Sequence, residues 1–121
     1  MSVAVLLGIG VLGGVGAIAR FLLDGAVAGR VGRSFPWGTL AVNLTGAFGL
    51  GLLAGAVVDG DPYRLAAIGL LGAFTTFSTW ALESHRLSED GQVGLGVANF
   101  ALSLALGVGV VWLGREIGVL L

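Results

Sequence analysis

Residues 72–80 read Gly-Ala-Phe-Thr-Thr-Phe-Ser-Thr-Trp, a run of hydroxyl and aromatic side chains inside an otherwise apolar segment. In hydrocarbon, a backbone or hydroxyl group that lacks a hydrogen-bond partner is costly, so such groups face protein or water inside a membrane. We therefore expect this run to be turned away from lipid, and it is the first candidate for a functional site.

The rest of the chain has the composition of an integral membrane protein. Of its 121 residues, 56% are hydrophobic and only 11% are charged, with a mean hydropathy of +1.01. Four stretches carry no charged side chain and are long enough to cross a bilayer: Met1–Ala19, Ser34–Val58, Leu65–Leu82 and Gly91–Gly114. We predict an all-α fold with four transmembrane helices. They form a single domain over residues 1–121, with spans at about 3–23, 37–58, 65–84 and 91–114.

The connections between these spans are short and carry most of the charge. We expect them at Asp24–Pro36, Asp59–Arg64 and His85–Asp90, which leaves no room for a soluble domain. Pro36 suits the first turn of the second helix. A cleaved signal peptide is the weaker alternative for the first span, because no basic residue precedes its apolar run.

Several classes of function are disfavoured by composition. Cysteine is absent, which excludes disulfides and thiolate metal sites, and the net charge of -1 gives no reason to expect a nucleic-acid partner. No phosphate-binding glycine loop and no nucleophile constellation is visible, so we do not expect an enzyme.

The chain contains 23 glycines, many more than helices in water tolerate. In a bilayer, small residues four apart let helix backbones approach closely, and Gly10 with Gly14 and Gly51 with Gly55 have this spacing. Gly46, Gly107 and Gly109 extend the smooth surface. A protein this small with so much packing surface is expected to form oligomers.

The arginines that set membrane orientation are almost evenly divided. With both termini on one side, that side holds Arg64 and Arg115, and the other side holds Arg30, Arg33 and Arg86. The positive-inside rule then gives almost no preference. Insertion in either direction, and a dimer of oppositely oriented subunits, are compatible with this balance.

Three of the four spans carry two polar side chains four residues apart, on one helix face. The pairs are Thr39 with Asn43, Thr79 with Glu83, and Asn99 with Ser103. Such stripes either line a hydrated pathway, where they replace solvent around a solute, or hold helices together by hydrogen bonds. For one pair the two interpretations are equal, and three pairs together favour a pathway.

Other side chains near the spans have competing interpretations. Glu83 is either a relay in a pathway or a solvated residue at the helix end, and the lone His85 is expected at the surface. Arg20 either reaches the headgroups or forms a vestibule cation that attracts anions. Phe77 and Trp80 share a face, and their ring edges could approach a small anion or simply pack.

Three motifs, in order, resemble those of the CrcB/Fluc fluoride channel family. Gly-Gly-Val-Gly-Ala-Ile-Ala-Arg at 13–20 is similar to its first-helix motif, Gly-Thr-Leu-Ala-Val-Asn at 38–43 to its second, and residues 72–79 to its third. The resemblance covers essentially the whole chain. It implies a fluoride-selective channel in the cell membrane that exports fluoride passively and lowers its cytoplasmic concentration.

The resemblance also implies an assembly and a set of site residues. The family forms an antiparallel dual-topology dimer with two narrow pores, either a homodimer or a heterodimer of two related chains. By position, Asn43 would contact the permeating anion and Phe77 would belong to an aromatic box. The family's polar track would correspond to Thr39, Ser78, Thr79, Glu83 and Ser103.

A structural sodium ion at the dimer centre is a further implication. In the family the third helix is broken, and backbone carbonyls hold the ion. By position, the break lies near 72–76 and the carbonyls belong to Gly72 and Thr75 of both subunits. Hard cations prefer oxygen ligands, and we expect glycine at Gly72 to permit the backbone angles of the break.

Two positions depart from the family pattern. Trp80 stands where the second phenylalanine of the aromatic box is usual, and Asn99 stands where some members have tyrosine. Because the indole is bulkier than a phenyl ring, an alternative is that this chain is the non-conducting subunit of a heterodimeric channel. A small dual-topology, proton-coupled exporter of cationic compounds is the alternative from another class, although the first span offers Arg20 and no carboxylate.

Overall fold

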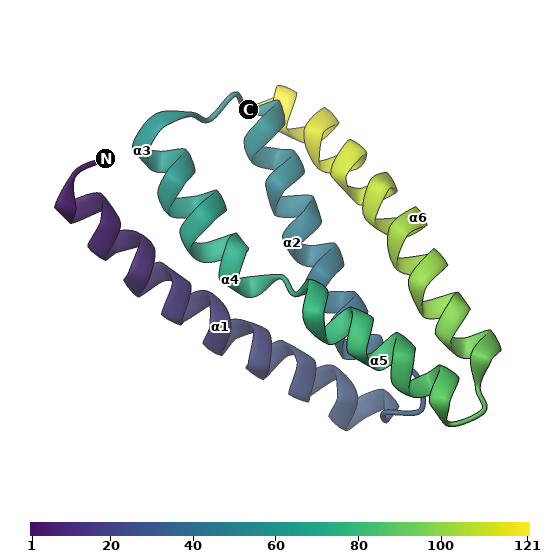
Figure 1. Cartoon of the computed structure of the whole chain (residues 1–121). Coiled ribbons are helices and arrows are strands. Elements are labelled where there is room, and N and C mark those ends of the chain that lie inside the picture. The colour runs from purple at the N-terminus through teal and green to yellow at the C-terminus, as the bar shows by residue number, and fades with distance from the viewer.

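The computed structural model describes residues 1–121 and consists of helices joined by short connections (Figure 1). The elements are α1 (Val3–Val31), α2 (Trp37–Gly55), α3 (Gly60–Tyr63), η1 (Arg64–Leu71), α4 (Gly72–Phe74), α5 (Phe77–Glu89) and α6 (Val93–Val119). Four helical units are long and apolar enough to cross a membrane: α1, α2, the composite Gly60–Glu89, and α6. The spans run alternately up and down, so both termini lie at one end of the molecule (Figure 1).

The third span is interrupted in its middle, as the resemblance of its motif to the family implies. Thr75 (φ -80°, ψ 158°) and Thr76 (φ -145°, ψ 122°) are extended, and α5 begins at Phe77. The hydroxyl of Thr76 accepts a hydrogen bond from the backbone N–H of Thr79 at 3.2 Å, a helix N-cap that starts the new helix cleanly.

Gly72 does not have the role in the break that we expected. Its φ of -61° and ψ of -38° are ordinary helical angles that any residue adopts. The expectation that glycine was needed there for its backbone freedom is therefore wrong, and the two threonines that follow α4 carry the change of direction.

The segment before the break, η1, is a π-helix, which sequence patterns do not reveal. Its wider turn is seen at its end, where the N–H of Gly72 donates to the carbonyl of Ala67, five residues back. Such turns are rare and occur often near functional sites. Gly69 on η1 lies against α1, and a Cβ atom there would be 3.2 Å from the Cα of Ile9.

Glycine-mediated packing is strongest between α2 and α6. Gly51 and Gly55 on α2 face Gly114 and Gly118 on α6, all four buried. A Cβ atom at Gly114 would be 3.1 Å from the backbone nitrogen of Leu52. The predicted close approach at Gly51 and Gly55 is confirmed, and it places the two helices backbone to backbone.

The other predicted glycine pair behaves differently. Nothing in the chain lies within 4 Å of a Cβ atom built at Gly10 or Gly14, so this pair packs against no helix of the same chain. The contact of α1 with the third span uses Gly16, where a Cβ atom would be 3.1 Å from the nitrogen of Phe74. The packing face of α1 is thus rotated from the one that the spacing suggested.

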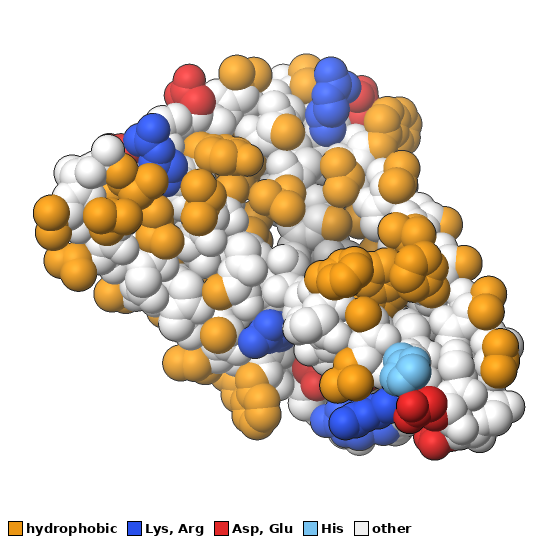
Figure 2. All heavy atoms as spheres, viewed as in Figure 1, with side chains coloured by type: hydrophobic (Ala, Val, Ile, Leu, Met, Phe, Trp, Pro, Cys, Tyr) orange, Lys and Arg blue, Asp and Glu red, His pale blue; other side chains and the backbone are white.

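The helices extend beyond the apolar segments. α1 continues to Val31 and so includes Asp24, and the connection expected from Asp24 to Pro36 shrinks to residues 32–36. Gly32, with φ 79°, ends the helix and donates its N–H to Ala28. Charged side chains gather mainly toward the two ends, with hydrophobic ones spread over the face between them (Figure 2).

Candidate functional site

The extended residue Thr76 is held by a bidentate clamp from α2. The Nδ2 of Asn43 donates to the carbonyl of Thr76 at 2.8 Å, and the N–H of Thr76 donates to Oδ1 of Asn43, also at 2.8 Å. The side-chain amide therefore satisfies both backbone groups of Thr76, which has no helical partners at the break. Of the two hydrogens on Nδ2, one is used and one remains for another acceptor.

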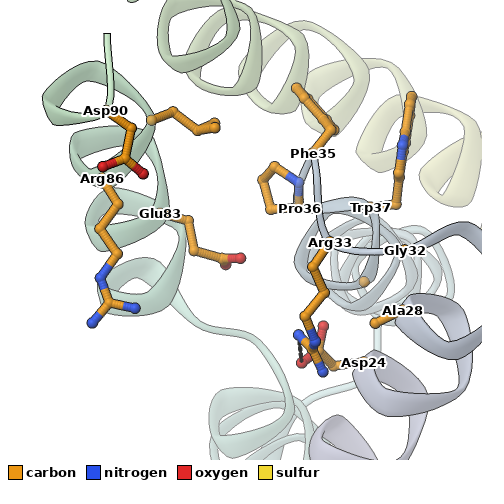
Figure 3. Close-up of a pocket in the computed structure, with 12 residues that line it drawn as sticks. Asp24, Ala28, Gly32, Arg33, Phe35, Pro36, Trp37, Glu83, Arg86 and Asp90 are labelled. Carbon is orange, nitrogen blue, oxygen red and sulfur yellow. Dashed lines mark ion pairs between the residues drawn. The ribbon is translucent and has the colours of Figure 1, made fainter. Parts of the chain in front are cut away.

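A second bond joins α2 to the third span one turn away. The hydroxyl of Thr39, which is only 3% exposed, donates to the Glu83 carboxylate on α5. Glu83 also extends into a cavity of about 280 Å³, whose facing wall carries the Asp24–Arg33 ion pair at 3.7 Å (Figure 3). We name this hollow the Glu83 cavity, and Arg33, Arg86 and Asp90 are among its lining residues.

A smaller hollow of about 200 Å³, the Arg20 cavity, lies between α1, α2 and the break. Its lining includes Arg20, Asp24, Thr39, Thr76 and Thr79. No carboxylate lies within ion-pair distance of Arg20, whereas Asp24 pairs with Arg33. A guanidinium without a pairing carboxylate, beside hydroxyl donors, is an arrangement that favours an anion.

Two further hollows flank Trp80. The break cavity, of about 250 Å³, is lined by Asn43, Ala47, Leu50, Thr75, Thr76, Phe77 and Trp80. The Ser103 cavity, of about 170 Å³, is lined by Leu40, Asn43, Leu44, Ala47, Trp80, Ser103, Leu104 and Gly107. Asn43, Ala47 and Trp80 belong to both hollows, so these three residues stand at the boundary between them.

The four hollows follow one another through shared or bonded residues. Asp24 and the Thr39–Glu83 bond connect the Glu83 cavity to the Arg20 cavity, and Thr76 connects the Arg20 cavity to the break cavity. The structure thus brings most of the predicted site residues into one course, although Ser78 lines none of the four hollows. The residues on it are Arg20, Thr39, Asn43, Phe77, Thr79, Trp80, Glu83 and Ser103.

The break also exposes polar groups in mid-span. Ser78 and Thr79 are exposed to the surroundings of the chain, and the adjoining Phe77 is 72% exposed. No backbone N–H donates to the carbonyls of Gly72 and Thr75, because Thr76 donates to Asn43 and Thr79 to the Thr76 hydroxyl. Freed carbonyls and hydroxyls cannot face lipid, so this surface needs a polar cover.

Four of the six residues in the polar pairs that the sequence showed, Thr39, Asn43, Glu83 and Asn99, join one span to another, whereas Thr79 bonds only Thr76 of its own span and the Ser103 side chain forms no hydrogen bond. Thr39 on α2 donates a hydrogen bond to Glu83 on α5, and Asn43 donates one to Thr76 at the break. Asn99 on α6 donates to Ser84 on α5 at 2.7 Å. The two interpretations of these stripes are compatible, because Thr39 and Asn43 also line the hollows. The lone His85 is exposed at the surface, where it contacts Glu89.

Sequence reasoning missed three residues that organise the site. Thr76 lies in the central run but has no predicted role of its own, although a threonine directly before a new helix is a recognisable N-cap signal. Asp24 was expected in a connection but lines two cavities. Ser84, at the end of the third expected span, bonds Asn99 across to α6; no spacing rule singles it out.

Fold and site together define a class of protein: a small multi-pass membrane protein whose broken third span presents polar groups at mid-depth. Residues 7–115 match the family described as "CrcB-like protein, Camphor Resistance (CrcB)". The chain belongs to this family.

Curated relatives of similar length are named as ion channels. A protein of Mycobacterium bovis named "Fluoride-specific ion channel FluC 2" is 48% identical over 97% of this chain and 93% of its own length. "Fluoride-specific ion channel FluC 1" of Symbiobacterium thermophilum is 46% identical over 91% of this chain and 94% of its own. "Fluoride-specific ion channel FluC" of Geobacter sulfurreducens is 46% identical over 90% of this chain and 92% of its own.

Proposed function

We propose that this chain forms a fluoride-selective channel in the cell membrane, through which fluoride leaves the cell passively and its cytoplasmic concentration falls. The observation that carries the proposal is the break at Thr75 and Thr76, clamped by Asn43 and flanked by the Arg20 cavity. Relatives of nearly equal length bear the name of fluoride-specific channels, which supports the same ion.

The course of hollows offers the chemistry that a small anion needs. Fluoride is strongly hydrated, and a pathway has to replace its water by donors. The hydroxyls of Thr79 and Ser103, the free hydrogen of the Asn43 amide and the guanidinium of Arg20 supply donors along one line. Ring edges of Phe77 and Trp80, which carry partial positive charge, complete the wall of the break cavity.

We propose further that two copies associate as an antiparallel, dual-topology dimer. The exposed polar face at the break cannot lie against lipid, and a second copy presents matching groups. Opposite orientations fit the near-equal division of arginines between the two ends. Two relatives have numbered names, FluC 1 and FluC 2, which keeps a heterodimer of related chains, one of them non-conducting, as the alternative assembly.

The backbone carbonyl oxygens at the break are suitable ligands for a structural sodium ion at the dimer centre. The carbonyls of Gly72 and Thr75 accept no backbone hydrogen bond, and hard cations bind oxygen ligands of this type. Two carbonyls from one chain make an incomplete coordination shell, so the ion would need the same pair from the second copy. Bound there, it would supply positive charge that neutralises converging carbonyl dipoles.

The test is ion efflux from liposomes that contain only the purified chain. We expect fluoride, followed with a fluoride electrode, to leave down its gradient when potassium and an ionophore carry the balancing charge, while chloride is retained. Proton-dependent efflux of an organic cation without fluoride leak would replace this proposal with the exporter. Absence of any flux, restored by co-reconstitution with a related chain, would identify a heterodimer subunit.

A further inference from the structure

We propose that Ser84 and Asn99 are positioning residues that lock the Trp80 indole as a fixed partition between the break cavity and the Ser103 cavity. The partition would set which anions pass from one hollow to the other. This inference rests on the proposed function, because selectivity among anions presupposes a conducting pathway.

Three hydrogen bonds close a ring around Trp80 and tie α5 to α6. The indole Nε1 of Trp80 donates to the backbone carbonyl of Asn99 at 3.3 Å, and Nδ2 of Asn99 donates to the hydroxyl of Ser84 at 2.7 Å. That hydroxyl in turn donates to the backbone carbonyl of Trp80 at 2.9 Å. Each member therefore fixes the next, and the indole N–H is fully engaged.

Two aromatic contacts hold the same ring system. The indole stacks on Phe100 of α6 with ring centroids 4.7 Å apart and an interplanar angle of 16°. Phe77 meets it in an edge arrangement at 5.2 Å and 79°. Trp80 is consequently only 8% exposed, although it borders two hollows.

Asn99 is a buried amide whose contribution to the structure is the hydrogen bond that its Nδ2 donates. Asn99 is 1% exposed, and its Oδ1 has no hydrogen-bond partner. An unpaired buried acceptor is costly, and an aliphatic side chain would fill the position without that cost. What the amide adds is the bond from Nδ2 to Ser84, which sets α6 in the register that brings the Asn99 carbonyl to the indole.

A locked indole has a direct consequence for selectivity. With its N–H occupied, Trp80 offers an anion only ring carbon and edge, so it acts through the width of the passage that it leaves beside Asn43 and Ala47. A larger anion such as chloride needs a wider passage than fluoride. An indole that is free to rotate about its side-chain bonds would let chloride pass. Loosening the ring of hydrogen bonds should therefore reduce the discrimination between fluoride and chloride.

The first experiment measures the lock itself. In a chain with Trp37→Phe and Trp112→Phe, both at exposed positions, Trp80 is the sole tryptophan. We expect its fluorescence anisotropy in liposomes to fall in Ser84→Ala and in Asn99→Leu. Ser84→Thr, which keeps the hydroxyl, should restore the value of the parent chain.

The second experiment measures fluoride and chloride efflux from the same variants without the tryptophan substitutions. Ser84→Ala should lower the fluoride-to-chloride flux ratio by about threefold, the factor expected for one interhelical hydrogen bond. Ser88→Ala is the matched control, because the Ser88 hydroxyl likewise donates to a backbone carbonyl of α5, that of Ser84, but forms no hydrogen bond with Trp80 or Asn99. In a Trp80→Phe background, Ser84→Ala should have no further effect.

The outcomes separate this inference from the proposed function. Unchanged anisotropy and flux ratio in Ser84→Ala would overturn it, as would a loss of selectivity that is equally large in the Trp80→Phe background. If the unsubstituted chain passes no fluoride, the proposed function fails, whereas the anisotropy still confirms or overturns the lock.

Discussion

Asn43 does for Thr76 what a neighbouring β-strand does for an extended residue: it bonds the N–H and the C=O together. In water the solvent could take this part, but within a membrane span the protein has to supply both partners. The residue that the family resemblance assigned to anion contact therefore also maintains the break. Its remaining amide hydrogen is available to an anion, so the two roles are compatible.

Replacement of this clamp by an apolar side chain should be costly. In Asn43→Leu the backbone N–H and C=O of Thr76 lose their partners, at roughly 1–3 kcal/mol for each unsatisfied group. We expect a lower melting temperature of the detergent-solubilised protein and loss of fluoride efflux. Thr45→Val is the control, since Thr45 bonds only the carbonyl of Ala41 on its own helix. Equal stability of the two variants would contradict the clamp.

Arg20 provides a residue-scale test of the electrostatics. Because no carboxylate pairs with it, Arg20→Gln should leave stability nearly unchanged and slow fluoride entry by up to about tenfold at low ionic strength. The difference should shrink in high salt, which screens the attraction. Arg30→Gln, an exposed arginine at the end of α1, is the control. A salt-independent loss of flux would point to a structural role for Arg20.

At the scale of elements, the frame is formed by α2 and α6, and the broken third span lies beside it (Figure 1). The opposed glycines on α2 and α6 remove side chains from the contact, so the two helices meet by their backbones. This rigid pair holds Asn43 on one helix and Asn99 on the other. The break between α4 and α5 is thereby positioned from both sides.

A methyl group at this contact should separate the helices. Gly114→Ala places a Cβ atom against the backbone nitrogen of Leu52, whereas Gly109→Ala, on the same helix, meets nothing within 4 Å. We expect the first variant to have a lower melting temperature in detergent, measured by circular dichroism. The second should be neutral or slightly more stable, because alanine is the better helix former. Similar melting temperatures would refute a backbone-to-backbone contact.

The sequence predicted the spans well and their internal detail less well. The stretches without charge predicted four membrane-spanning helices, and four helical units are long and apolar enough to cross a membrane; the run at 72–80 identified the interrupted one. The π-helix of η1 and the packing face of α1 depend on which helices meet, which residue spacing does not record. The clamp from Asn43 joins residues 33 positions apart, and local residue spacing gives no signal for a pair so far apart in the chain.

At the scale of the whole molecule, the polar surface at the break supports the proposed association with a second copy, and the near-equal division of arginines between the two ends fits an insertion of that copy the other way up. Only 20 of the 121 residues are buried within one chain, so most apolar side chains are left for lipid or for a partner. Fold, composition and the proposed pathway all support the proposed assembly of more than one chain.

Topology can be measured directly because the chain has no cysteine. Ser34→Cys and Asp59→Cys place single thiols at the two ends of α2, both exposed. With dual topology, a membrane-impermeant maleimide added to intact cells should label part of each population, and lysis should expose the rest. Complete labelling of one position and none of the other would establish a single orientation and exclude the antiparallel dimer.

The central claim is passive, fluoride-selective conduction, and the reversal potential of the purified chain in a planar bilayer tests it most directly. With opposed gradients of fluoride and chloride, the account predicts that the current reverses at the equilibrium potential of fluoride and that a pH gradient does not move it. A reversal potential that follows chloride, or one that shifts with the proton gradient, would contradict the account.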